Sequence, residues 1–94
     1  MSEIYRYFKG NCDVGLGPGT IYNEFCGETA TRQAEQYNGR WFSSKDTDYH
    51  EELGIALCDR YLSEIEHSEG LMEISSTEFE AAWLEATGSK NAPP

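Results

Sequence analysis

The chain has 94 residues, an aromatic content of 13% and a net charge of −10 at pH 7. This length fits one domain, and the aromatic content excludes a chain that is disordered throughout. There is no apolar run of the roughly 20 residues that a membrane-spanning helix needs, and residues 1–9 lack the apolar stretch of a signal peptide. We therefore expect one cytoplasmic α+β domain over residues 1–88, with a flexible tail over residues 89–94.

The first half of the chain has the alternating pattern of β-strands. Strands are predicted over residues 4–9, 20–26, 29–37 and 40–44. The glycine-rich stretch 10–19 is predicted to be a hairpin loop, and Gly27-Glu28 a tight turn. Asn38-Gly39 is a strong type I′ hairpin signal, because both residues tolerate a positive φ. Four strands joined in this way predict an antiparallel four-stranded meander.

The second half predicts a helix near the C-terminal end. Ser75 and Glu78 have the spacing of a capping box, and an apolar helical face follows, formed by Phe79, Ala82, Trp83 and Ala86. Gly88 is expected to end the helix. We predict that this helix packs on one face of the sheet and that Trp83 lies at the centre of the contact.

Between these elements the pattern is weaker. Residues 45–58 are expected to form an acidic loop, part of which could lie against the sheet. In the segment 59–67, Leu62 and Ile65 fit a short helical turn, but an extended loop fits nearly as well.

The charge is distributed unevenly. Residues 1–45 carry five acidic and five basic side chains, whereas residues 46–85 carry twelve acidic side chains and one basic one, Arg60. Such a field repels nucleic-acid backbones and anionic membranes and attracts basic surfaces, although a merely solubilising surface is the open alternative. The predicted contact residues for a basic protein partner are Asp46, Asp48, Tyr49, Glu51, Glu52, Glu64, Glu66 and Glu69.

No motif predicts catalysis, a metal site or a cofactor. The glycine-rich loop lacks the Lys-Ser or Lys-Thr pair of a phosphate-binding loop, and the stretch from Asp46 lacks the glycine and glutamate that a calcium loop needs at positions 6 and 12. His50 and His67 lie in no recognisable motif. The three cysteines are predicted to be reduced thiols, with a Cys12–Cys26 bridge as the open alternative.

A nucleic-acid interface is not favoured. Basic and aromatic side chains could share a face of the sheet, but the acidic second half would oppose a phosphate backbone. The residues concerned are Arg6, Lys9, Arg32, Arg40, Lys45, Tyr5, Tyr7 and Trp41.

The chain also resembles a family of short acidic bacterial proteins that are similar to the immunity proteins of polymorphic toxins. The segments that carry the resemblance are residues 5–8, the strand pair around Arg32 and Trp41, Tyr49-His50, and residues 73–83. It implies a non-catalytic, stoichiometric inhibitor, such as an immunity protein; a nucleic-acid-mimicking anti-defence protein would use the same physics. The alternative is a regulatory or scaffold subunit that binds a host enzyme through an aromatic face of its sheet.

Overall fold

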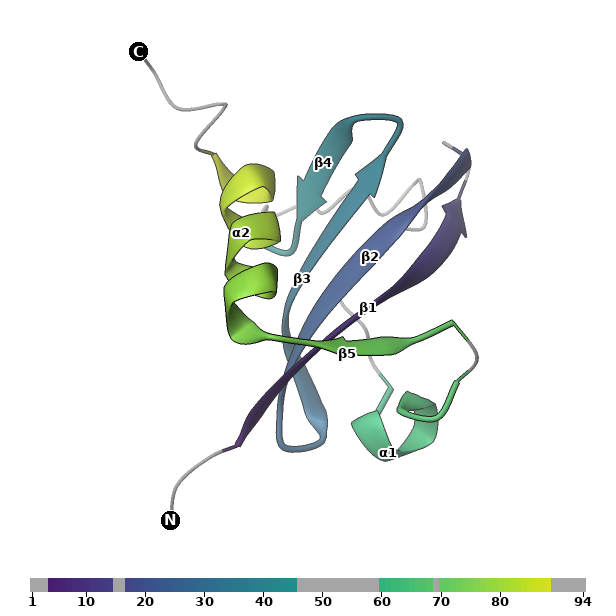
Figure 1. Cartoon of the computed structure of the whole chain (residues 1–94), viewed down its shortest axis with the longest axis vertical. Coiled ribbons are helices and arrows are strands. Elements are labelled where there is room, and N and C mark those ends of the chain that lie inside the picture. The colour runs from purple at the N-terminus through teal and green to yellow at the C-terminus, as the bar shows by residue number, and fades with distance from the viewer. Residues whose placement is uncertain (1–3, 15–16, 46–59, 69, 89–94) are drawn as a thin grey trace.

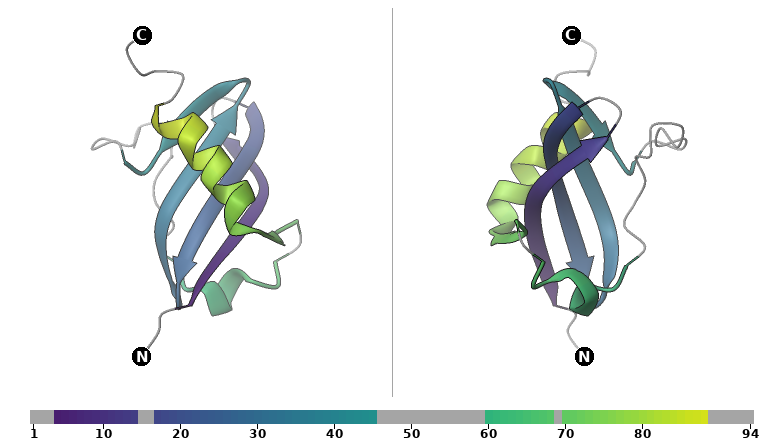
Figure 2. Two further views of the ribbon diagram at one scale, coloured as in Figure 1. Left: turned by 60° about the vertical axis from the view of Figure 1, so that its left-hand side comes forward. Right: turned by 90° about the vertical axis from the view of Figure 1, so that its right-hand side faces the viewer.

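The computed structural model describes residues 4–14, 17–45, 60–68 and 70–88, with the backbone alone at residues 12–14 and 17. One antiparallel sheet has the strand order β4-β3-β2-β1-β5 (Figure 1). A long helix, α2, lies across one face of this sheet, and a short helix, α1, lies near the β2–β3 turn (Figure 2). The bounds are β1 (Tyr5–Val14), β2 (Gly17–Cys26), β3 (Thr29–Tyr37), β4 (Arg40–Ser43), α1 (Leu62–Ile65), β5 (Met72–Ile74) and α2 (Ser76–Thr87).

The fold class, the antiparallel meander and the C-terminal helix are confirmed, but the predicted number of four strands is wrong. The sheet has a fifth strand, β5, which pairs with β1 over three residues. Three residues are too few to give a recognisable alternation in the sequence. Strand β5 forms because the outer edge of β1 offers backbone partners to the segment that leads into α2.

The first hairpin is longer than predicted. Residues 10–14 and 17–19 belong to β1 and β2 and not to a loop, and they pair in continuous register with Cys12 opposite Gly19. Gly19 has a packing role, because a Cβ atom there would lie 2.3 Å from the Cδ1 atom of Tyr37. The glycine therefore lets the fully buried Tyr37 ring lie against β2.

The predicted turn and helix ends are present, with one change. Asn38 and Gly39 have φ values of 54° and 81°, as a type I′ turn requires. The Ser75 hydroxyl accepts a hydrogen bond from the Glu78 backbone N–H at 3.1 Å, and Gly88 ends the helix with a φ of 145°. The Glu78 carboxylate was predicted to complete the capping box. Instead it accepts a hydrogen bond from Lys9 of β1 at 2.7 Å.

Apolar side chains are buried on both faces of the sheet. On one face, Phe79, Ala82 and Ala86 of α2 are buried against the sheet, and on the opposite face Phe8 packs with Phe25, Ala30 and Leu62. Phe79 is fully buried, whereas Trp83 is only partly buried and stacks on Phe79 with 6.2 Å between ring centroids. The prediction that Trp83 forms the centre of the contact is wrong; Phe79 occupies that place.

Strand β3 also places polar side chains in the core on the face opposite α2. Gln33, Glu35 and Tyr37 alternate along this strand, and all are at most 2% exposed. The Gln33 side chain accepts from Asn23 at 2.8 Å and donates to Glu35 at 2.7 Å, and the Tyr37 hydroxyl donates to Glu35. These hydrogen bonds offset the cost of removing the polar groups from water.

We predict that Phe79→Ala destabilises the protein by about 3–5 kcal/mol, because it empties a fully buried site between α2 and the sheet. Trp83→Ala should cost less, since part of that ring is already in contact with water. Chemical denaturation of both variants measures the two losses. Equal losses would contradict the assignment of Phe79 to the centre of the contact.

Candidate protein-binding surface

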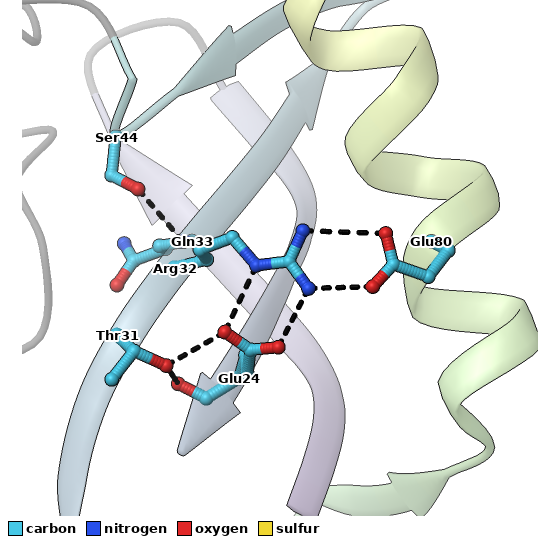
Figure 3. Close-up of polar contacts among 6 residues, drawn as sticks. All are labelled: Glu24, Thr31, Arg32, Gln33, Ser44 and Glu80. Atoms are coloured by element: carbon cyan, nitrogen blue, oxygen red, sulfur yellow. Dashed lines mark hydrogen bonds and ion pairs between the residues drawn. The ribbon is translucent and has the colours of Figure 1, made fainter. Parts of the chain in front are cut away.

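Arg32 on β3 holds α2 to the sheet (Figure 3). Its Nε and Nη2 atoms donate to the two carboxylate oxygens of Glu24 on β2 at 2.9 and 2.6 Å. Its Nη1 and Nη2 atoms donate to the carboxylate of Glu80 on α2 at 3.2 and 2.5 Å. Glu24 also accepts from the Thr31 hydroxyl at 2.7 Å. One guanidinium therefore makes paired hydrogen bonds to two carboxylates, a geometry that lysine cannot reproduce.

The same guanidinium lies against aromatic rings of α2. Its central carbon is 5.0 Å from the ring centroids of both Phe79 and Trp83. On the sheet side, the Tyr7 ring lies 5.2 Å from the Phe79 ring. Cation–π attraction thus adds to the ion pairs, and the rings reduce the access of water to the charges.

These contacts shift several pKa values. The hydrogen bonds from Arg32 hold the pKa of Glu24 below its ordinary value, and Thr31 and Tyr7 act in the same direction. Burial raises the pKa of Tyr7, with a further contribution from the neighbouring Glu24 charge. The two carboxylates raise the pKa of Arg32, which stays charged. Glu24, whose side chain is 6% exposed, is therefore a buried anion stabilised mainly by one cation.

Two further cations of β1 bind acids from the second half of the chain. Arg6 donates to Glu73 at 3.0 and 3.1 Å and to Glu66 at 2.9 Å, and Lys9 donates to Glu78 at 2.7 Å. The balanced first half and the acidic second half are therefore joined by charge pairing. Because each arginine lies between two carboxylates, the Arg6 and Arg32 clusters each keep a net charge of −1.

The predicted contact residues fall into two groups. Glu64 is exposed at the start of α1. Its Oε1 atom accepts a hydrogen bond from the Tyr61 backbone N–H and lies 3.6 Å from Arg60 Nε. Glu66 lies nearby but turns toward Arg6. The other six lie outside the described residues: Asp46, Asp48, Tyr49, Glu51, Glu52 and Glu69.

The outer face of α2 was not among the predicted contacts. Thr77, Ala81 and Leu84 follow one another at positions i, i+4 and i+7, all are exposed, and Leu84 is 57% exposed. Glutamates lie on both sides of this stripe, Glu80 on one side and Glu78 and Glu85 on the other, and the helix has no basic residue. The sequence contained the signal, since this spacing complements the buried face of the helix.

This arrangement is suited to binding by charge and apolar contact. Within the part of the chain that the structure describes, no three His, Cys, Asp or Glu side chains form a group able to hold a metal ion. His67 is almost fully exposed and Cys26 is half-buried, whereas His50 and Cys58 lie outside the described residues. Among the helices described, none is long and apolar enough to cross a membrane.

The basic and aromatic side chains of the sheet do not form one open surface. Arg6 and Lys9 lie on opposite faces of the sheet. Arg6 lies beside Phe8, whereas Lys9 lies beside α2. Tyr7 packs on Phe79, and Trp41 packs on Tyr22 with 6.0 Å between ring centroids. These side chains are therefore divided between the two faces of the sheet.

The chain matches no protein-family model, and no curated protein or solved structure is significantly similar to it.

We predict that the protein loses stability as the pH falls below about 4.5, the ordinary pKa of a glutamate. The folded-state pKa of Glu24 is lowered, so its stabilising contribution is fully present above pH 4.5 and is lost as the pH falls through the lowered value. Glu24→Gln should reduce the slope of melting temperature against pH in this window. Glu85→Gln, for which no partner appears among the described residues, should keep the wild-type slope. Identical slopes for all three proteins would refute the role given to Glu24.

Proposed function

We propose that this chain is a small acidic protein-binding domain, without catalytic activity, that inhibits its partner stoichiometrically by covering a basic surface. An immunity protein, or an anti-defence protein that mimics nucleic acid, would act in this way in the cytoplasm. The observation that carries the proposal is the outer face of α2, where exposed Leu84 lies between Glu80 on one side and Glu78 and Glu85 on the other, and the helix has no basic residue.

Electrostatics supports this function in two ways. Carboxylates held on a rigid helix can occupy the positions where a nuclease-type partner would bind substrate phosphates. A net charge of −10 also accelerates the encounter with a cationic surface and disfavours nucleic acids and anionic membranes as partners. The Arg6 and Arg32 clusters keep an excess carboxylate each, so internal pairing does not cancel the field.

An apolar contact residue is needed beside the charges. Ion pairs at the exposed rim of an interface add little affinity, whereas a desolvated apolar side chain at its centre contributes more. Leu84 has the exposure and the position for this role, and the small neighbour Ala81 allows close approach of a partner. The proposed contact thus has an apolar centre and an acidic rim.

The alternative, a regulatory or scaffold subunit that binds through an aromatic sheet face, has less surface to draw on. Tyr7 is partly covered by Phe79, and Trp41 is partly buried. Tyr5 is 47% exposed and would have to carry that contact.

The immobilised chain first retains its partner, and mass spectrometry identifies that protein. The test then measures the rate at which the chain associates with it. Asp48→Asn/Glu51→Gln/Glu52→Gln and Glu85→Gln should each slow association, most strongly below about 0.15 M salt, where screening is weak. Leu84→Ala should mainly speed dissociation, because it removes contact area and not charge.

Glu28→Gln is the matched control, because it removes the same charge as Glu85→Gln at the β2–β3 turn, away from α2, and the amide oxygen can still accept from the Ser63 backbone N–H. It should change the association rate less than Glu85→Gln does. If all variants associate like the wild type at every salt concentration, the electrostatic inhibitor proposal is wrong. Inhibition of the retained protein's activity at a one-to-one ratio would test the inhibitor role itself.

A further inference from the structure

Among the described residues, no strand lies beside part of the outer edge of β1. Strand β1 is ten residues long, but β5 pairs only with Tyr7, Phe8 and Lys9. Figure 1 shows the arrowhead end of β1 continuing past β5. An open strand edge presents backbone groups that can pair with another chain.

The direction of these backbone groups follows from the register. The carbonyl of Ile4 accepts a hydrogen bond from the Gly27 N–H at 3.0 Å, so the backbone groups of Ile4 point toward β2. In an antiparallel pair this direction alternates along the strand, so those of Tyr7 and Lys9 point toward β5. By the same alternation the N–H and C=O groups of Asn11 and Asp13 point away from β2. Within the described part of the chain they have no hydrogen-bond partner.

A cavity of about 320 Å³ opens beside this edge, on the face of the sheet that carries α2. The cross-strand pairs Lys9–Tyr22 and Asn11–Thr20 form its floor, and Met72 of β5 lines it as well. The cavity therefore lies where a strand added next to Asn11 would place a side chain.

We propose that residues 11–14 of β1 receive an extended segment of the partner protein, which pairs with this edge and inserts one uncharged side chain into the cavity. Backbone pairing supplies affinity in such strand addition, and the pocket supplies selectivity. The inserted side chain is uncharged because Thr20, Tyr22 and Met72 line the cavity and the charge of Lys9 is already paired with Glu78, while the net charge of −10 repels anions. Residues that flank it in the segment are basic, for the same electrostatic reason. The inference rests on the proposed function, and it specifies that the partner binds through an extended segment.

A phage-displayed library of random heptapeptides tests the inference without the natural partner. Peptides selected on the wild-type chain should bind Asn11→Pro about tenfold or more weakly, because proline removes the outward N–H and crowds an incoming strand. The β1–β2 pairing does not use this N–H, so proline is tolerated at an edge position. Asn11→Ala is the matched control, since it shortens the side chain but keeps the N–H. It should lose much less affinity.

Hydrogen exchange of the wild-type chain provides a second measurement that does not depend on the folding of Asn11→Pro. Bound peptide should slow exchange at the Asn11 and Asp13 amides. Peptides that leave both amides unprotected, or a library that yields no binder, would overturn the inference. A concentration-dependent dimer that Asn11→Pro abolishes would assign the edge to a second copy of the chain and also overturn it. None of these results would alter the salt dependence that tests the acidic surface.

Discussion

The bond network of Arg32 is the interaction on which the packing of α2 depends. This one side chain joins β3 to Glu24 of β2 and to Glu80 of α2, and its guanidinium covers two aromatic rings. Removing either partner of a buried ion pair leaves an uncompensated charge, which costs more than the pair contributes. The buried Glu24 carboxylate on β2 holds the Arg32 guanidinium in place, and the guanidinium in turn contacts Glu80 and two aromatic rings of α2.

The same principle explains how a chain with an excess of carboxylates stays compact. The cations of β1 lie where the second half of the chain packs against the sheet. Arg6 binds the segment around β5, and Lys9 binds the first turn of α2. Self-repulsion is reduced at these points, while both arginine clusters remain negative. The protein thus combines internal pairing with a net negative field.

Two surfaces of different physical character result. The outer face of α2 is a rigid helix surface whose contacts would depend on salt, because charges surround its apolar centre. The open edge of β1 offers backbone hydrogen bonds and a cavity suited to an uncharged side chain, two contacts that do not themselves depend on charge. In the proposed complex, the face of α2 would increase the speed of encounter and the edge of β1 would add selectivity.

Local patterns in the sequence were enough to predict the third strand, the Asn38-Gly39 turn, the Ser75 cap and the buried face of α2, because each depends on residues close together in the chain. Three features depended on contacts between distant segments of the chain. They are strand β5, the extension of β1 and β2 through the glycine-rich stretch, and the burial of Phe79 in place of Trp83 at the centre of the helix–sheet contact. Composition predicted an acidic second half, yet which acids turn inward was decided by the positions of Arg6, Lys9 and Arg32 in the folded sheet. Charge content is a property of the sequence, whereas pairing and exposure require the tertiary structure, because they depend on which side chains the strand register brings within a few ångströms of one another.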